Sequence, residues 1–227
     1  MKKIVFLTGA GISKESGIPT FRDAGDGLWE NFDVQSVATH QAIEKNPDLV
    51  YSFINGLRNK YKDCIPNEAH KAIAELENDY EVVVITQNID TLHELAGSSN
   101  VLHLHGDLTK VRAVDNENLL FDYVEDITPE TEIDGHKVRP HVVLFGEYVR
   151  NITEASEILK DADICVVVGT SFDVYPAANL VMYVPYYNPI YYIDPNPAPT
   201  PDYPDIIVIK DIATNGIKKL LDMLRNE

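Results

Sequence analysis

Short apolar runs rich in β-branched residues recur along the chain and predict seven strands. They are Ile4–Leu7, Val82–Ile85, Val101–His105, Val142–Phe145, Ile164–Val168, Ile190–Ile193 and Ile206–Ile209. Several are apolar without alternation, which is typical of strands covered on both faces. Helix-like patterns such as Glu68–Glu77 and Ile212–Leu224 separate most of them. The pattern predicts an α/β fold with a doubly wound, mainly parallel, Rossmann-like sheet that binds ligands beyond the carboxyl ends of its strands.

Two stretches interrupt this alternation and predict a small second lobe within one domain, residues 1–227. Residues 32–79 contain helical patterns without a strand, and residues 111–139 are polar, acidic and poor in periodicity. We expect these insertions to form the small lobe. The large lobe would then consist of about 1–31, 80–110 and 140–227.

The composition is that of an ordinary globular chain, with 44% apolar and 24% charged residues. The net charge of −17 repels nucleic-acid phosphates and anionic lipid, so we expect neither nucleic acid nor membrane as a partner. No apolar run approaches the roughly 18 residues of a spanning helix. The two cysteines, Cys64 and Cys165, form no Cys-x-x-Cys pair, which favours reduced structural thiols and a cytoplasmic protein.

The first predicted strand runs directly into Gly9-Ala10-Gly11-Ile12-Ser13. Glycines there allow a tight turn and let backbone N–H groups approach a pyrophosphate at a helix N-terminus, although many such sequences are ordinary turns. Lys14 stands where the dehydrogenase fingerprint has its third glycine. That departure disfavours a dehydrogenase.

Polar residues also follow the second predicted strand, in Gln87-Asn88-Ile89-Asp90. Asn88 and Asp90 can hydrogen-bond a carboxamide or ribose hydroxyls. Capping of the helix that follows is the structural alternative. Gly169-Thr170-Ser171 and Asp194 close two further strands, and small or acidic residues at strand ends suit a nucleotide.

His103 and His105 end the third predicted strand, where alternation puts both on one face. No third ligand can be assigned, so we predict no metal site. His105 precedes a glycine that permits close approach, which makes it a candidate general base. A buried structural histidine is the alternative.

Together these motifs resemble the sirtuin family over nearly the whole chain. Further matching pieces are Pro66-Asn67-Glu68-Ala69-His70, His105-Gly106 and Phe145-Gly146-Glu147. The bacterial deacylase branch is the most similar, through Gly27-Leu28-Trp29-Glu30, Thr128-Pro129-Glu130 and Arg139-Pro140-His141-Val142-Val143.

The resemblance implies a protein-lysine deacylase that consumes NAD and releases nicotinamide and 2′-O-acyl-ADP-ribose. It implies that His105 and Asn88 are catalytic. The implied NAD contacts are Gly9, Ala10, Gly11, Ile12, Ser13, Phe21, Arg22, Gln87, Asn88, Ile89, Asp90, Gly169, Thr170, Ser171, Asp194, Asn196 and Ala213. The implied substrate contacts are Ile54, Leu57, Val143, Phe145, Gly146 and Glu147, with residues 143–147 pairing main chain to main chain with an acyl-lysine peptide.

Functions of two other kinds stay open, one enzymatic and one not. The same pocket would serve an NAD glycohydrolase or an ADP-ribosyltransferase, and a non-enzymatic NAD sensor is the binding-module reading. His105 and the Phe-Gly-Glu segment favour deacylation. We expect a monomer.

The sequence departs from the family pattern in the small lobe. Most sirtuins hold a structural zinc with four cysteines there, whereas residues 111–139 contain none, and Ala113 stands where the first ligand is expected. His136 with Asp115 or Asp134 would be a poor, hard-ligand substitute. We therefore expect no zinc, with the lobe held by apolar contacts from Leu119, Leu120, Phe121 and Tyr123.

A second departure concerns the acyl group. Aligning Phe53–Arg58 with the helix that carries the Tyr-x-x-Arg pair of desuccinylating sirtuins puts Ile54 and Leu57 at the two positions. Arg58 is one residue away, which on a helix is a turn of about 100°, so it should face elsewhere. Acetyl or longer apolar acyl groups are then expected to be preferred over succinyl or malonyl.

Overall fold

The computed structural model describes residues 1–20, 33–170, 177–199 and 206–225. Its large sheet has six parallel strands in the order β10-β9-β8-β1-β2-β3. The strands are β1 (Lys3–Thr8), β2 (Glu81–Thr86), β3 (Val101–His103), β8 (Ile164–Val168), β9 (Ile190–Ile193) and β10 (Ile206–Ile209). Chain order runs outward in both directions from the β1–β8 pair. This pair is therefore the topological switch point, where open α/β sheets bind ligands.

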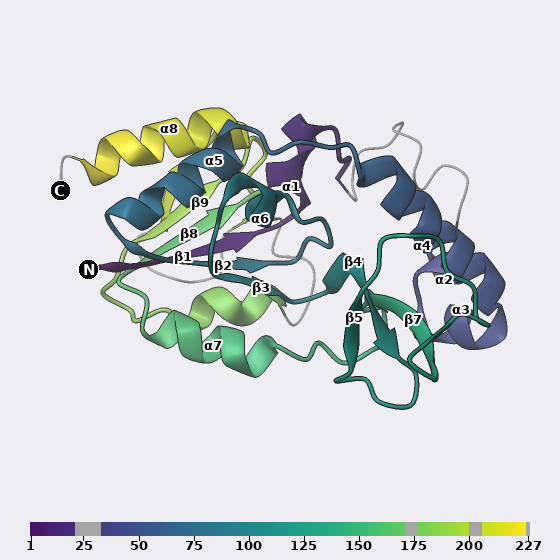
Figure 1. The fold of residues 1–227 in the computed structure, drawn as a ribbon. Helices are drawn as coiled ribbons and strands as arrows, with labels where there is room; N and C mark the ends of the chain where they lie inside the picture. Colours follow the sequence, from purple (N-terminus) through teal and green to yellow (C-terminus); the bar gives the residue numbers. More distant parts are fainter. Residues whose placement is uncertain (21–32, 171–176, 200–205, 226–227) are drawn as a thin grey trace.

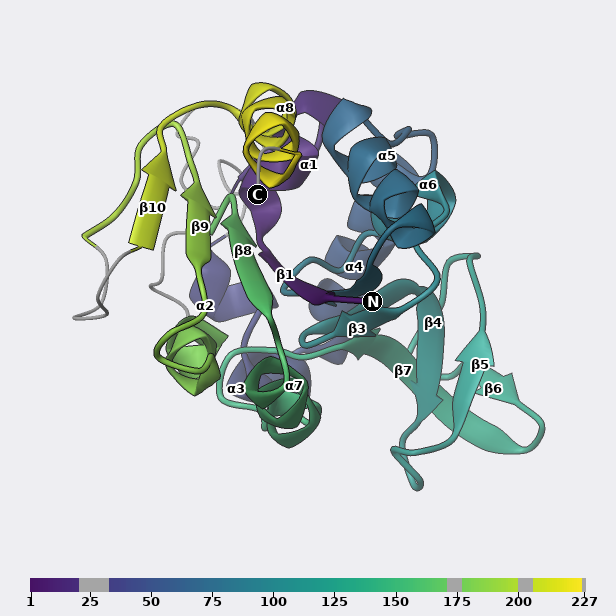
Figure 2. The same cartoon turned by 90° about the vertical axis from the view of Figure 1, so that its left-hand side faces the viewer.

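Helices cover both faces of the large sheet (Figures 1 and 2). One face carries α5 (Glu68–Glu75) and α8 (Ala213–Leu224), and the other carries α7 (Ile152–Lys160) and η3 (Ala177–Tyr183). Alternate side chains of β1 enter the two layers: Phe6 packs with Ile217 of α8, and Val5 packs in the cluster that contains Leu159 of α7. Both layers are fully apolar at their centres, as the unbroken apolar strands predict.

The small lobe combines three helices with an antiparallel sheet of order β5-β4-β7-β6 (Figure 1). The helices are α2 (Val34–Val37), α3 (His40–Lys45) and α4 (Pro47–Tyr61), and the strands are β4 (Gly106–Ala113), β5 (Leu120–Asp122), β6 (Glu132–Ile133) and β7 (His136–Val142). Tyr51 of α4 donates its hydroxyl hydrogen bond to the carbonyl of Val138 at 3.0 Å. Helices and sheet pack together in two clusters, one that contains Ile54 and Leu108 and one that contains Tyr51 and Val138.

Four short elements complete the described chain. They are α1 (Ala10–Ser13), η1 (Lys14–Ser16), η2 (Leu76–Asn78) and α6 (Leu92–Ala96). No helix in the described ranges is long and apolar enough to span a membrane. Both cysteines are free thiols, and burial raises the pKa of Cys165, within β8, to about 12.

Three expectations about these elements are wrong. The run Val142–Phe145 is not a strand, because β7 ends at Val142 and Phe145 makes only an isolated bridge with Thr39. The third strand ends at His103, so His105 lies beyond it. Residues 111–139, which were expected to be polar and poor in periodicity and in which no strand was predicted, contain most of the antiparallel sheet. Its strands were missed because they mix polar and apolar residues and lack the continuous apolar runs that mark the parallel sheet.

The expected lobe contents also differ from the structure. Helix α5, within the 32–79 segment, packs through Ala69 and Ile73 into the core of the large sheet. In the small lobe, Phe121 and Tyr123 contact the core cluster as expected, whereas Leu120 is 41% exposed. Leu119 is partly exposed and lies outside that cluster. The cluster's buried residues are Tyr51, Val111, Ile127 and Val138.

Candidate active site

The loops that follow β1 and β8 meet backbone to backbone at the switch point. The N–H of Gly9 donates to the carbonyl of Val168 at 3.0 Å, and that of Gly11 donates to the carbonyl of Gly169 at 2.9 Å. A Cβ on Gly11 would lie 2.5 Å from the Gly169 Cα, and Gly169 itself has a φ of 61°. These two N–H groups are therefore used within the protein, and the expectation that N–H groups of this loop approach a pyrophosphate stays a prediction for the rest of the loop. The glycines are needed because the two loops touch.

Asn88, Ser13 and Asp90 form a buried hydrogen-bonded chain beside this contact. The Asn88 amide donates to the carbonyl of Gly9 at 3.2 Å and to Ser13 Oγ at 3.1 Å, and the Ser13 hydroxyl donates to Asp90 Oδ2 at 3.0 Å. Burial raises the pKa of Asp90, although the N–H of Leu92 and the Ser13 hydroxyl oppose this. The N-cap of α6 is Thr91, so neither Asn88 nor Asp90 is its N-cap residue, although Asp90 accepts from the N–H of Leu92 in the first turn at 3.1 Å.

His105 has the protonation pattern of a base. Its Nδ1 lies 2.9 Å from the carbonyl oxygen of Gln87. Because a carbonyl can only accept, Nδ1 carries the proton and Nε2 is the nitrogen that can take one. Burial lowers the pKa of His105 below its ordinary value, so the ring is neutral at neutral pH. The Gln87 side chain donates to Thr170 Oγ1 at 3.0 Å, which links this loop to the one after β8.

His103 contacts the next carbonyl of the same loop, that of Asn88, and also bonds to Glu94. Its Nδ1 lies 2.9 Å from the carbonyl oxygen of Asn88, and its Nε2 lies 2.8 Å from Glu94 Oε1. The two histidines thus meet successive carbonyls of the loop after β2. Within the described ranges no group of three His, Cys, Asp or Glu side chains could hold a metal ion.

The segment 143–147, expected to pair with a peptide, is largely engaged within the protein. The N–H groups of Val143 and Phe145 donate to the carbonyls of His105 and Ala38, each at 2.8 Å. The carbonyl of Phe145 accepts from the N–H of His40 at 2.9 Å. These contacts fix the segment between the His105 loop and the start of α3.

The Glu147 side chain, at the end of this segment, accepts three hydrogen bonds. Its carboxylate accepts from the Leu144 N–H at 2.9 Å, from Arg112 at 3.2 Å and from Arg139 at 2.7 Å. Sequence reasoning named Glu147 only as a main-chain contact and missed both arginines. Burial alternates along β7, which carries Arg139, but not along β4, where residues 111–113 are all buried, and no strand was predicted over residues 111–139.

The remaining predicted residues lie in the small-lobe core, after β9 and at the starts of α1 and α8. Ile54 and Leu57, 2% and 5% exposed, belong to the core of the small lobe together with Leu108. Asp194, at the end of β9, accepts from the N–H of Asn196 at 2.8 Å. Ile89 packs against the small-lobe core, and Ala10, Ile12 and Ala213 lie at the starts of α1 and α8. Phe21, Arg22 and Ser171 lie outside the described residues.

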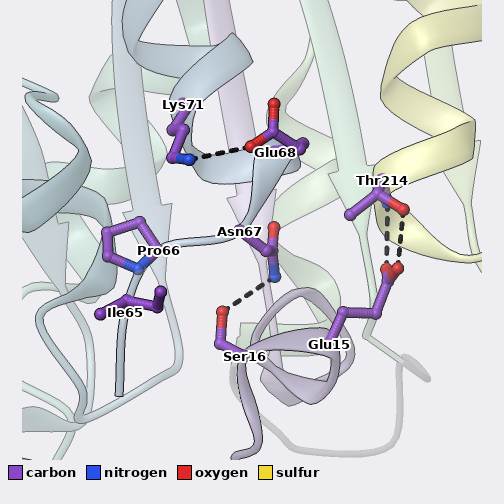
Figure 3. A pocket seen from close by; sticks show the side chains of 8 residues that line it. All are labelled: Glu15, Ser16, Ile65, Pro66, Asn67, Glu68, Lys71 and Thr214. Carbon is purple, nitrogen blue, oxygen red and sulfur yellow. Dashed lines mark hydrogen bonds and ion pairs between the residues drawn. The ribbon is translucent and has the colours of Figure 1, made fainter. Parts of the chain in front are cut away.

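A pocket of about 380 Å³ lies behind the glycine loop, between η1 and the N-termini of α5 and α8 (Figure 3). Glu15 accepts from the N–H and hydroxyl of Thr214 at 3.1 and 2.6 Å. Asn67 donates to the carbonyl of Ile12 at 2.8 Å and to Ser16 Oγ at 3.0 Å. The polar side chains that line the pocket hydrogen-bond to one another and to the loop. Through these bonds Asn67 and Thr214 hold the segment after the glycine loop in place.

Comparison with known proteins decides the family. A sequence model described as the Sir2 family matches residues 9–176. The chain belongs to the Sir2 family. Within this family, relatives named NAD-dependent protein deacylase include those of Bacteroides thetaiotaomicron, 45% identical over 99% of this chain and 98% of the relative, and Helicobacter pylori strain 26695, 44% identical over 99% and 98%.

Solved Sir2 structures share the whole fold. A mutant Sir2 homologue in complex with ADP-ribose has a TM-score of 0.87 at 37% identity, covering 99% of this chain and 92% of its own. A Sir2 homologue in complex with NAD has a TM-score of 0.87 at 38% identity, covering 99% and 90%. A Sir2 mutant with a deacetylated p53 peptide and 3′-O-acetyl-ADP-ribose has a TM-score of 0.83 at 29% identity, covering 97% and 92%.

Proposed function

We propose that this chain is an NAD-dependent protein-lysine deacylase that releases nicotinamide and 2′-O-acyl-ADP-ribose. The observation that carries the proposal is the His105 ring, with Nε2 as its basic nitrogen and Nδ1 held on the carbonyl of Gln87, in the same loop after β2 that carries Asn88 and Asp90 of the buried hydrogen-bonded chain. The relatives named as NAD-dependent protein deacylases support the same activity.

The donor set at the switch point fits NAD. Asp90 is a buried carboxyl whose direct partners are a hydroxyl and an N–H, which suits the uncharged carboxamide of a nicotinamide. Asn88 uses its amide N–H groups on Gly9 and Ser13, which leaves its amide oxygen to accept a bond. The described residues proposed to contact NAD are Gly9, Ala10, Gly11, Ile12, Ser13, Gln87, Asn88, Ile89, Asp90, Gly169, Thr170, Asp194, Asn196 and Ala213.

His105 acts as the general base in this proposal. NAD, when bound, would supply a ribose carbon that exchanges nicotinamide for the acyl oxygen. Nε2 of His105 then accepts the proton of the ribose hydroxyl that attacks the acyl carbon, while the Nδ1–H bond to Gln87 keeps the ring oriented. A neutral ring at neutral pH is the form this step requires.

The acyl-lysine peptide is proposed to lie along residues 143–147. Because the N–H groups of Val143 and Phe145 are used within the protein, the main chain of Gly146 and the carbonyl of Val143 are the groups we assign to peptide pairing. Gly146 has a φ of 89°, which only glycine adopts readily.

Mass spectrometry of acyl-lysine peptides incubated with NAD tests the proposal. We expect deacylated peptide and acyl-ADP-ribose in equal amounts. Free ADP-ribose with unchanged peptide would instead establish an NAD glycohydrolase, and ADP-ribose attached to protein would establish a transferase. No nicotinamide release would leave a binding protein.

We also propose the zinc content and the cellular location of the protein. We propose a small lobe that folds without zinc, because Ala113, at the expected first ligand position, is fully buried on β4 in the small-lobe sheet. The two free thiols suit a cytoplasmic protein. A monomeric state stays a prediction.

A further inference from the structure

The His103 side chain bridges Asn88 and Glu94 at the start of α6, with one hydrogen bond to each. Glu94 lies on α6, Asn88 lies in the loop before it, and His103 at the end of β3 joins the two. The His103 side chain is 12% exposed and that of Glu94 39% exposed. The His103 imidazole thus ties the main chain of Asn88 to the helix that follows it.

The partners of His103 require both of its ring nitrogens to carry protons. A carbonyl oxygen and an ionised carboxylate can only accept, so Nδ1 and Nε2 both donate and the ring is an imidazolium. Burial disfavours this charge, but Glu94 and the Asn88 carbonyl outweigh burial and raise the pKa of His103. The His103 imidazolium in turn holds the pKa of Glu94 below its ordinary value, against the effect of burial.

His103 and His105 therefore hold consecutive carbonyls of one loop in opposite charge states. His105 donates one bond, to Gln87, and stays neutral. His103 donates two bonds and is charged. A neutral His103 would turn a lone pair toward either the Glu94 carboxylate or the Asn88 carbonyl, so losing its second proton must break one of the two bonds.

We propose that Glu94 and His103 are positioning residues that hold Asn88 in place for NAD cleavage, and that loss of the His103 proton sets the upper pH limit of activity. The inference rests on the proposed function. It adds an alkaline limit governed by His103 to an acid limit governed by His105, which must be neutral to act as the base.

The other titratable groups around His103 do not replace Glu94. They are Asp90 and His93 near α6, Asp107 on β4 and His141 on β7. Burial lowers the pKa of His141 to about 4 and that of His93 well below its ordinary value, so both are neutral. Asp107 adds a weaker stabilising charge than Glu94 to the His103 imidazolium.

The test is the pH profile of kcat/KM for NAD in the wild type and in Glu94→Gln. Glutamine can still accept from Nε2 but carries no charge, so the alkaline limb should begin about one pH unit or more lower. At pH values on that limb we expect about a tenfold loss relative to wild type, with the acid limb unmoved. His136→Gln, which removes a histidine paired with Asp115 at 2.9 Å in the small lobe, is the matched control and should change neither limb.

The outcomes separate the two proposals. Absence of deacylation by the wild-type protein defeats the proposed function itself. An active wild type whose alkaline limb coincides with that of Glu94→Gln overturns the inference alone, as does an equal loss at every pH. NMR titration of the histidines in the wild type covers the case of an unfolded variant: His103 should titrate above and His105 below about 6.5, and the reverse order overturns the inference.

Discussion

Arg112 of β4 and Arg139 of β7 lie directly opposite each other in the antiparallel ladder. Like charges in this position destabilise a sheet, and here the Glu147 carboxylate binds both guanidinium groups, at 3.2 and 2.7 Å. Burial, with the neighbouring Arg139, lowers the pKa of Arg112 to about 10. Against its own burial, Arg139 and the Leu144 N–H hold the pKa of Glu147 below its ordinary value. The 143–147 segment is thus anchored to the small-lobe sheet through the Glu147 carboxylate.

Glu147→Gln should therefore cost stability and weaken peptide binding together. Removing the charge leaves two partly buried arginines unneutralised, and we expect a loss of about 3 kcal/mol in the free energy of unfolding. Urea unfolding measures this, and the KM for peptide should rise more than that for NAD. Glu130→Gln, which removes an exposed partner of Lys137, is the control and should cost less than about 1 kcal/mol. Equal losses in the two variants would contradict the role of Glu147.

His105→Ala should abolish deacylation while leaving the fold intact. The loss of a general base typically costs about 10²–10⁴ in rate. NAD binding should remain, because the Asn88, Ser13 and Asp90 chain does not pass through His105. Single-turnover assays of acyl transfer, with NAD affinity by calorimetry, make the comparison. Turnover close to wild type would refute the assignment.

Acid should destabilise the fold through two buried histidines. His70 and His93 lie edge to face with ring centroids 4.8 Å apart, and each has one buried nitrogen without a partner in the described chain. Burial lowers the pKa of His70 to about 4 and that of His93 well below 6.5. The unfolded chain then binds more protons between about pH 6.5 and 4, so stability is full above that window and is lost as the pH falls through it.

His70 alone sets a minimum size for this effect, because the pKa values of His93 and His141 are also lowered in the folded chain. A change from 6.5 to about 4 corresponds to roughly 3 kcal/mol at the acid end of the window. Urea midpoints should fall steadily from pH 7 to pH 5. His70→Gln should weaken that slope, and a midpoint independent of pH would exclude the mechanism.

The sequence indicated the large sheet because its buried strands are continuous apolar runs, and β9 and β10 were predicted to the residue. It did not indicate β4 to β7, because these strands mix polar and apolar residues and contain no continuous apolar run. It placed His105 and Asn88 at strand ends, but the charge of His103 depends on Glu94 and a carbonyl, which only the fold brings together. The glycine loop shows the same limit, since its partner Gly169 is distant in sequence.

Purified protein should contain no stoichiometric zinc. Where zinc ligands would be expected, the described small lobe has the buried Ala113 and the core formed by Tyr51, Val111 and Val138. A chelator should therefore leave the melting temperature unchanged. Elemental analysis that found one zinc per chain would refute the prediction. Tyr51→Phe, which removes the hydroxyl bond to Val138, should lower the melting temperature instead.

The preferred acyl group should be apolar, and the geometry of α4 gives the reason. Arg58, the cation nearest the expected acyl position in sequence, donates through Nε to the carbonyl of Leu108 at 2.7 Å and through Nη1 to that of Glu125, so it is committed to the small-lobe main chain. Ile54 and Leu57 offer no charge-assisted partner to a succinyl carboxylate. Its desolvation without a partner should cost roughly 2–5 kcal/mol. We expect kcat/KM for acetyl- and hexanoyl-lysine forms of one peptide to exceed that for the succinyl form by about 30-fold or more. Arg58→Lys should lower stability without changing the acetyl-to-succinyl ratio, whereas a succinyl value equal to the others, or a ratio that changes in this variant, would place a cation in the acyl pocket.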